Sequence, residues 1–378
     1  MSRRLRTTTA VVAACATAAL GLTTAVGASA STSRAATAAA TKAWSQTLDD
    51  TVGAPFAIAL AKGDVWYTDG AASTVNRIHH GKSMVVAHGP MPGEVAGLAA
   101  SADGKSYAYT TTDYSNGATT LTIRTAGKAP VVADLSTYEQ RHNPDGWRTY
   151  GIVKNESSDP QCARDVLGGL TGGQATYKGG IDSHPYAVAS LGNGAWAVAD
   201  AGGNDILKVD RHGRISVIAV LPPQPILLTA EMVTAAGLPP CVAGVTYAFE
   251  PVPTDVERGE RGMLWVSTLP GGPEDPSLGA RGSVYMVNPW NHSSTRRATG
   301  FLGATDLALG SHGAIYVTEL FAGKVSKLQN GRITTAAEIS SPLSVEAWGG
   351  YLYVGSMGQI DQQTGEVKSP GAITKIRP

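Results

Sequence analysis

Acidic side chains near the ends of predicted strands are the residues of this chain best suited to chemistry. Together with one histidine and one asparagine, they form the candidate ligand or metal residues: Asp182, His184, Asp200, Asn204, Asp255, Asp306 and Glu319. Carboxylate and amide oxygens suit calcium or magnesium, so Ca²⁺ or Mg²⁺ is the cofactor that such a set could hold. Asp255 and Asp306 each follow a threonine at the same position of two repeats, so they could share a cation. Alternatively, they could accept hydrogen bonds from backbone amides of the neighbouring repeat.

The other candidates have simpler interpretations, and several chemistries have no support. Asp200 and Asn204 can hydrogen-bond the backbone of their own loop. Asp182, Ser183 and His184 are consecutive on one extended segment, where alternate side chains point to opposite faces, so they cannot form a catalytic triad by themselves. The sequence has no glycine-rich phosphate loop, no nucleophile elbow and no Cys/His spacing typical of zinc. Equal numbers of basic and acidic residues, 30 of each, exclude a basic field for binding nucleic acid.

Short strands in a repeating pattern must position these residues. A strand of small apolar residues is followed by a glycine turn, a strand with an aromatic residue, and a third strand with a basic residue between aliphatic ones. The pattern occurs six times, with first strands that begin at Pro55, Val95, Pro185, Pro253, Thr305 and Pro342. Six copies at this spacing predict an all-β fold, a six-bladed β-propeller.

Both ends of the repeat region carry information about closure. The sixth copy ends at Pro378, two residues after its third strand, and therefore lacks an outer strand. We expect residues 42–48 to supply this N-terminal strand, complete the last blade and remove an exposed edge. The propeller then spans residues 44–378, with insertions near 136–181, 221–250 and 268–281. Loops of this length are where binding specificity is expected.

The first thirty residues have the features of a secretory signal peptide. Three arginines precede an apolar stretch, and residues 28–30 supply the small side chains of a cleavage site. Residues 31–43 are rich in Ala and Thr and are expected to be a disordered leader. No later stretch has the roughly 20 consecutive apolar residues that a membrane-spanning helix needs. We therefore expect a secreted, extracellular protein and a monomer.

Removal of the signal peptide leaves two cysteines, Cys162 and Cys241. In an oxidising compartment, an isolated pair is expected to be bridged, the alternative being two buried thiols. Both cysteines lie in proline-rich, irregular surroundings within insertions. The predicted disulfide therefore ties two long loops together.

One stretch of the third repeat and two later motifs resemble a known family. Residues 182–186 read Asp-Ser-His-Pro-Tyr, residues 252–256 read Val-Pro-Thr-Asp-Val, and residues 305–308 read Thr-Asp-Leu-Ala. These motifs resemble the ScyD/ScyE family of secreted propellers, over roughly residues 45–378. His184 stands where family members have Asn. Because the biochemical role of that family is not established, the resemblance implies the fold and not an activity.

Two classes of function are compatible with these features. The first is a non-catalytic binding or scaffold module, whose partner is a small molecule, a surface polymer or a protein bound over the central channel or on the inserted loops. The alternative is an enzyme with its site at the central channel, either a divalent-metal-dependent lactonase or a streptogramin-lyase-like enzyme. A lactonase of this type would have a metal-binding Glu before Pro55, where this chain has Ala54.

Overall fold

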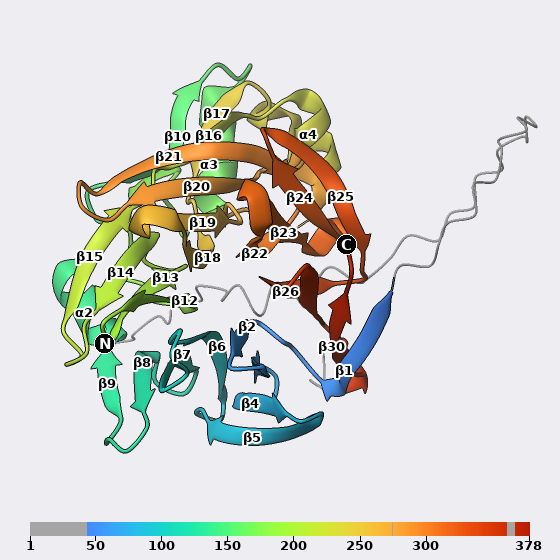
Figure 1. The fold of residues 1–378 in the computed structure, drawn as a ribbon. Helices are drawn as coiled ribbons and strands as arrows, with labels where there is room; N and C mark the ends of the chain where they lie inside the picture. The colour runs from blue at the N-terminus through green and yellow to red at the C-terminus, as the bar shows by residue number, and fades with distance from the viewer. Residues whose placement is uncertain (1–43, 274, 361–366) are drawn as a thin grey trace, which may run out of the picture.

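Antiparallel sheets of four strands make up most of the structure. The computed structural model describes residues 44–273, 275–360 and 367–378; the signal peptide and the leader, predicted over 1–30 and 31–43, lie outside these ranges. Seven four-stranded sheets occur in the described residues, and six of them follow one another around the molecule (Figure 1). This mainly β architecture agrees with the propeller class that the repeats predict.

Five of the sheets have their four strands in chain order, so that each strand pairs with the one before it. The first sheet contains β2 (Ile58–Ala61), β3 (Asp64–Asp69), β4 (Thr74–His79) and β5 (Lys82–His88), and the second contains β6 (Gly93–Ala100), β7 (Ser106–Asp113), β8 (Ala118–Thr125) and β9 (Val131–Asp134). The third contains β12 (Pro185–Gly192), β13 (Ala195–Asp200), β14 (Asp205–Val209) and β15 (Ile215–Val220). The fourth contains β18 (Pro253–Arg258), β19 (Leu264–Thr268), β20 (Gly282–Asn288) and β21 (Ser293–Phe301), and the fifth contains β22 (Ala304–Leu309), β23 (Ile315–Glu319), β24 (Lys324–Gln329) and β25 (Arg332–Glu338). Each sheet is thus built from one continuous stretch of chain.

The sixth sheet combines strands from both ends of the described chain. Its order is β1 (Ser45–Val52), β30 (Gly371–Ile376), β27 (Tyr351–Ser356) and β26 (Pro342–Trp348). β1 is antiparallel to β30, with Ser45 opposite Ile376 and Val52 opposite Gly371. The outer strand of this sheet is therefore N-terminal, and it continues to Val52, beyond the expected range of 42–48. A small hairpin, β28 (Gln359–Ile360) and β29 (Val367–Ser369), lies between β27 and β30 along the chain.

The seventh sheet was not predicted from the sequence, where loops were expected. Its order is β11 (Thr176–Lys178), β10 (Thr149–Asn155), β17 (Val245–Phe249) and β16 (Gln224–Leu227). The insertions near 136–181 and 221–250 therefore form one layer, because β10 pairs with β17, Ile152 opposite Tyr247. The helices and 3₁₀ turns are α2 (Leu135–His142), α3 (Pro160–Leu170), α4 (Ala230–Ala235), η1 (Pro240–Val242), η2 (Glu260–Gly262), η3 (Pro276–Leu278), η4 (Ser311–Gly313) and η5 (Leu320–Ala322). We call the seventh sheet with α3, α4 and η1 the insertion layer; it lies at the top of Figure 1.

Side chains between neighbouring sheets form the core. Trp196 on β13 is fully buried and belongs to the same apolar cluster as Ala108 and Leu121 of the preceding sheet. Trp196 is the aromatic residue that the repeat pattern places on the second strand of the third repeat. The hairpin between β12 and β13 turns at Asn193 and Gly194, which both have positive φ, 54° and 75°. An Asn-Gly pair suits such a turn because both residues tolerate the left-handed backbone conformation.

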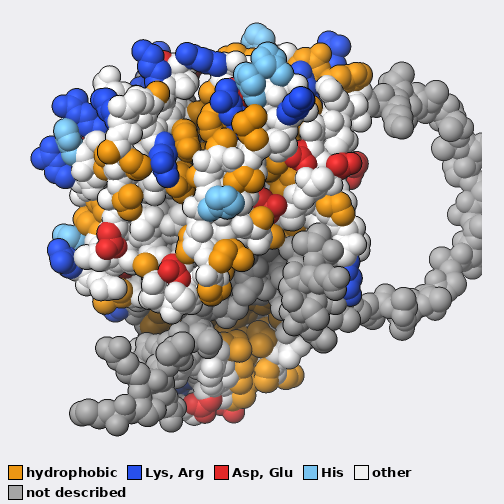
Figure 2. Space-filling view, turned by 90° about the horizontal axis from the view of Figure 1, so that it is seen from below, with side chains coloured by type: hydrophobic (Ala, Val, Ile, Leu, Met, Phe, Trp, Pro, Cys, Tyr) orange, Lys and Arg blue, Asp and Glu red, His pale blue; other side chains and the backbone are white. Residues whose placement is uncertain are grey.

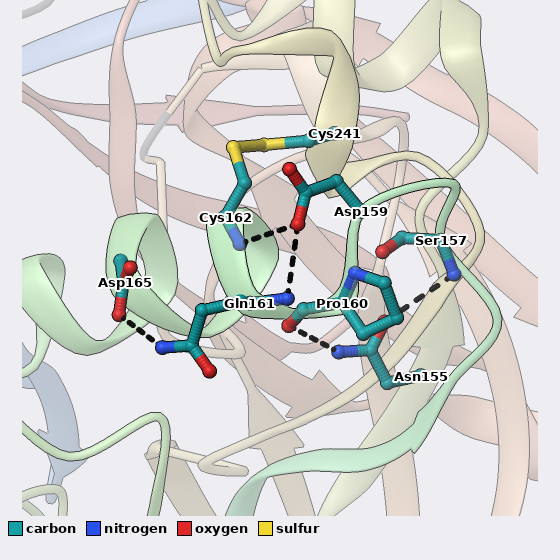
Figure 3. Close-up of a disulfide and its surroundings, with 8 residues drawn as sticks. All are labelled: Asn155, Ser157, Asp159, Pro160, Gln161, Cys162, Asp165 and Cys241. Carbon is teal, nitrogen blue, oxygen red and sulfur yellow. Dashed lines mark hydrogen bonds between the residues drawn. A yellow bond between two sulfur atoms is a disulfide. The ribbon is translucent and has the colours of Figure 1, made fainter.

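The predicted disulfide is confirmed. Cys162 on α3 is bonded to Cys241 on η1, with the two Cα atoms 6.1 Å apart (Figure 3). Asp159 caps α3, since its carboxylate accepts hydrogen bonds from the backbone N–H groups of Gln161 and Cys162. The bond joins positions that are 79 residues apart and so holds the two insertions together.

One face of the molecule carries charges of both signs. On the face shown in Figure 2, basic side chains are interspersed with hydrophobic and acidic ones. This mixed surface agrees with the balanced composition of the chain, 30 basic and 30 acidic residues. No helix in the described part of the chain is long and apolar enough to cross a membrane.

Candidate functional site

Six carboxylates gather where the insertion layer meets the sheet β12–β15. We call this group the acidic cluster; its members are Glu139, Asp145, Asp182, Asp200, Asp205 and Glu250. The first two come from α2 and the turn after it, the next three border β12, β13 and β14, and the last follows β17. The sequence placed only Asp182 and Asp200 among its candidates. Glu139, Asp145 and Glu250 lie in separate insertions, and Asp205, although it belongs to the third repeat, was not among the candidates.

Asn204 holds the acidic cluster together. This residue adopts a left-handed backbone conformation, with φ of 55°. Its side-chain Nδ2 donates to Asp145 Oδ2 at 3.0 Å and to Glu250 Oε2 at 3.1 Å, and its Oδ1 accepts from the backbone N–H of Val252 at 3.1 Å. The predicted role of Asn204 in its own loop is therefore a minor one, a long contact of 3.4 Å to the carbonyl oxygen of Gly202. Its main effect is to connect the loop between β13 and β14 to both insertions.

Asp200 fulfils the structural role predicted for it. Its Oδ1 accepts from the backbone N–H of His184 at 2.6 Å and of Gly203 at 3.2 Å, and its Oδ2 accepts from the Ser183 hydroxyl at 2.6 Å. These contacts fix the segment before β12 against the end of β13. Both carboxylate oxygens of Asp200 therefore accept hydrogen bonds from within the protein.

Other members of the acidic cluster lack partners. Within the described residues, neither carboxylate oxygen of Asp205 has a hydrogen-bond partner, and the same is true of Asp145 Oδ1 and Glu139 Oε1. All three side chains are buried. Burial first, and then the neighbouring carboxylates, raise the pKa of Glu139 to about 8 and that of Asp205 well above its usual value. Burial likewise raises the pKa of Asp145 to about 6. Glu139 therefore carries a proton at neutral pH.

His184 forms a buried ion pair beside the acidic cluster. Its Nε2 contacts the carboxylate of Glu94, a residue of β6, and both side chains are buried. Burial is the largest single effect and would lower the pKa of His184. The charge of Glu94, its hydrogen bond and the charges of Asp200 and Asp182 together outweigh burial, so the pKa is raised. A cavity of about 210 Å³ lies next to this pair and is also lined by Glu139, Asp182 and Tyr114.

A second set of carboxylates lies on three first strands. Asp255 and Glu257 on β18, Asp306 on β22 and Glu346 on β26 interact electrostatically with one another. Burial raises the pKa of Asp255 to about 7 and that of Glu346 to about 8. We call this group the first-strand carboxylates. They carry no basic partner among the described ion pairs.

The hydrogen bonds of Asp255 and Asp306 match one of the two sequence alternatives. Asp255 Oδ2 accepts from the backbone N–H of Leu307 at 3.3 Å, and Asp306 Oδ2 accepts from that of Val345 at 3.2 Å. Each carboxylate thus bonds an amide of the next sheet. In the described ranges, no three His, Cys, Asp or Glu side chains are arranged so as to hold a metal ion.

Glu319 lies apart from both groups. Its carboxylate accepts from the backbone N–H of Leu302 at 2.7 Å and from the hydroxyl of Ser326, and Lys324 Nζ lies 3.5 Å away. These partners all belong to the sheet β22–β25 or to the turn that enters it. The sequence candidate Glu319 therefore makes its contacts within one sheet.

A mainly apolar cavity near the acidic cluster has a volume of about 480 Å³. It lies between the insertion layer and the loop after β19, within the range 268–281 that the sequence identified as an insertion. Its lining is aliphatic and aromatic, with one carboxylate, and includes Leu167, Leu228, Leu238, Tyr177, Tyr247, Phe249, Glu250, Gly271 and Leu278. No single segment contributes enough of this lining to be recognised in the sequence.

Comparisons with known proteins identify the fold class. Neither a protein-family model nor a curated protein matches this chain, so the resemblance to the ScyD/ScyE family rests on its motifs alone. An oxidoreductase from Thermus thermophilus, described as a glucose dehydrogenase, is similar over 88% of this chain and 99% of its own, at 16% identity and a TM-score of 0.52. The PQQ-bound aldose sugar dehydrogenase from Streptomyces coelicolor is similar over 89% and 98%, at 11% identity and a TM-score of 0.52. Both are β-propeller-like. At identities this low, the similarity shows a shared fold and gives no information about activity.

Virginiamycin B lyase from Staphylococcus aureus is also similar, over 89% of this chain and 99% of its own. The sequence identity is 16% and the TM-score is 0.48. A likeness at this level carries no inference about the activity of the present chain.

Proposed function

We propose that this chain is a secreted, non-catalytic binding protein that holds a small molecule in the 480 Å³ cavity beside the insertion layer. The cavity is the observation that carries the proposal, because its volume falls within the range of roughly 300–1,000 Å³ typical of small-molecule sites. Its mainly apolar lining with one carboxylate is also typical of such sites. Secretion is supported by the disulfide that joins Cys162 and Cys241.

The proposal includes a closed ring. Six of the four-stranded sheets are the blades, and β1 completes the last blade from the N-terminal side. The pairing of β1 with β30 supports this arrangement, since it joins the two ends of the described chain within one sheet. The insertion layer is then an addition to the ring and not a seventh blade, because its strands come from two separate insertions.

The lining of the cavity favours binding over catalysis. Thr171 is the one aliphatic hydroxyl among its described lining residues, and it donates to the carbonyl oxygen of Gln174. Glu250 is the one carboxylate there, and it accepts from Asn204. A nucleophile with an adjacent general base is what covalent catalysis needs, and these contacts provide none.

A glycine in the lining offers a direct test. A Cβ atom added to Gly271 would meet its nearest neighbour, the Cβ of Glu250, at an ordinary 3.9 Å, so Gly271→Leu is compatible with folding and adds a side chain beside the cavity. Nile red, a neutral dye whose fluorescence rises in apolar sites, serves as the probe. We expect saturable binding to the wild type and an affinity at least about tenfold lower for Gly271→Leu.

Gly180→Leu is the matched control. Gly180 is exposed, and a Cβ atom added there would have no neighbour within 4 Å. This variant should bind Nile red as the wild type does. Absence of saturable binding to the wild type, or equal affinities of the two glycine variants, would contradict the proposal.

An enzyme acting at the first-strand carboxylates is the second candidate, either a divalent-metal-dependent lactonase or a streptogramin-lyase-like enzyme. The observation that favours it is the raised pKa of Asp255 and Glu346, to about 7 and about 8, since perturbed carboxyl groups concentrate at functional sites. Calorimetric titration with CaCl₂ and MgCl₂ tests the metal requirement. Binding that disappears in Asp306→Asn would support this candidate, and no measurable binding would remove its metal-dependent form.

A further inference from the structure

We infer that the ligand of the 480 Å³ cavity is a cationic amphiphile, an apolar body with one ammonium group that Glu250 receives. This inference rests on the proposed function and names the ligand class for the same site. It follows from three features of the lining: its apolar walls, the one carboxylate among its described residues, and the tyrosines that interact with that carboxylate.

The walls select for an apolar body. Leu167 of α3, Leu228 and Leu238 from the second insertion, and Leu278 of η3 all line the cavity. Of these, Leu167, Leu228 and Leu278 are buried. Each methylene group placed against such walls gains about 0.8 kcal/mol of transfer free energy, so an alkyl or aryl body is favoured over a sugar or nucleotide.

The polar end of the cavity is acidic. Glu250 is partly exposed, and the hydrogen bond from Asn204 Nδ2 at 3.1 Å orients its carboxylate. Its charge acts on Asp145 and Asp182, whose carboxyl groups lie close to it in the acidic cluster. An approaching cation therefore meets a negative potential that reaches beyond Glu250 itself, and an anion is repelled.

Two tyrosines flank this carboxylate. Burial and the charge of Glu250 raise the pKa of Tyr177, which hydrogen-bonds to both Glu250 and Tyr247. Both tyrosines line the cavity. Aromatic faces attract ammonium groups through the negative potential of the ring, so aromatic rings in the lining favour a cationic ligand over a neutral one.

The basic groups of the region do not neutralise Glu250. No Lys, Arg or His belongs to the described lining. Arg281 lies nearby, but its guanidinium stacks 4.5 Å from the centre of the Phe249 ring and donates to the carbonyl oxygens of Pro270 and Gly271. Arg148 interacts electrostatically with Asp145, and its guanidinium stacks 4.0 Å from the ring centre of the exposed Trp147. Within the described residues, neither arginine forms an ion pair with Glu250.

Three ligands that share one alkyl chain test the inference: n-octylamine, n-octanol and n-octanoate, titrated calorimetrically into the full chain at pH 7. We expect octylamine to bind at least about tenfold more tightly than octanol, and octanoate to bind most weakly. Glu250→Gln should reduce the affinity for octylamine to the level of octanol. The affinity for octanol itself should stay unchanged. Gln keeps an oxygen that can accept from Asn204, so the variant removes the charge and preserves the shape.

Glu156→Gln is the matched control for the charge. Glu156 lies in the first insertion, pairs with Lys154 at 2.9 Å and has a side chain that is 62% exposed. This variant should bind all three ligands as the wild type does. Equal affinities for octylamine and octanol, unaffected by Glu250→Gln, would overturn the cation preference and leave the binding function intact. Binding of none of the three ligands would overturn the proposed function as well.

Discussion

At the scale of single residues, burial of the carboxyl groups determines their protonation. Glu139 is 3% exposed, and its Oε1 has no partner in the described residues. Burial, then Asp200 and Asp145, raise its pKa to about 8. A folded-state pKa above the unfolded value means that unfolding releases a proton, so the contribution of Glu139 to stability is complete below about pH 4 and is lost as the pH rises towards 8.

Glu139→Gln should therefore be neutral in acid and stabilising in base. Because Gln cannot ionise, the variant avoids the cost that the wild type incurs above about pH 8. We expect similar melting temperatures for the two proteins at pH 5, and a variant that melts at least about 3 °C higher at pH 9, measured by differential scanning calorimetry. Glu156→Gln, on an exposed side chain, should show no such difference. A shift of equal size at both pH values would contradict the assignment of the raised pKa.

The sequence predicted some of these residues and not others, for a physical reason. Asp182, His184, Asp200 and Asn204 were candidates because they lie near the ends of predicted strands. They belong to one repeat, and the structure brings them together around the loop between β13 and β14. Glu250 joins them through Asn204 although it is 46 residues further along the chain. Contacts over such separations depend on how the insertions pack, and no local pattern of residue types carries that information.

At the scale of elements, the insertion layer depends on the disulfide. Cys162 and Cys241 close a loop of 79 residues, and chain-entropy arguments assign about 4–5 kcal/mol to a cross-link of this length. The apolar cluster of this layer includes Val233, Val242 and Tyr247 and contains none of the side chains of the other sheets' clusters. Loss of the bond should therefore loosen the layer before the ring.

The double variant Cys162→Ser/Cys241→Ser tests this dependence. We expect Nile red binding to fall by at least about tenfold, because α3 and the second insertion both line the cavity. Calorimetry should show an earlier, small transition for the insertion layer and a main transition near that of the wild type. Reduction of the wild type with dithiothreitol should reproduce both effects. Unchanged dye binding in the double variant would show that the layer holds its shape without the bond.

The elements of the insertions also show where sequence patterns stop being informative. The repeats have a period of two and glycine turns, which predict strands independently of their partners. In the insertion layer, by contrast, β10 pairs with β17 from a different insertion, and Gly151, with a positive φ of 89°, lies within the first of these strands. The sequence predicted loops in these segments and missed their sheet.

At the scale of the whole molecule, the two ends of the described chain meet in one sheet, and β1 contacts more than that sheet. Val52 of β1 is 1% exposed and shares an apolar cluster with Ile58, Val65 and Tyr67 of the first sheet and Ile373 of β30. A strand in this position supports two neighbouring sheets at once. The six repeats predicted such a closing strand because the last copy lacked one.

A hydrogen bond also crosses from β1 to the first sheet. The hydroxyl of Tyr67 donates to Asp49 Oδ2 at 2.6 Å, and hydrogen bonds to that carboxylate lower the pKa of Asp49 despite the opposing effect of burial. This contribution to stability is present above the usual pKa of an aspartate and is lost as the pH falls through the lowered value. The interaction therefore holds β1 against the first sheet at neutral pH.

Removal of β1 should destabilise the ring as a whole. A chain that begins at Gly53 loses the buried Val52 side chain, the Tyr67–Asp49 hydrogen bond and the pairing along β30. Deletion of one large buried side chain alone costs about 1–5 kcal/mol, so we expect the melting temperature to fall by about 10 °C or more. A synthetic peptide with the sequence of residues 44–52 should restore part of this loss in a concentration-dependent manner, because it binds the folded state. A peptide of the same composition in scrambled order should not. A truncated chain that melts as the wild type does would contradict closure by β1, whatever the state of the insertion layer.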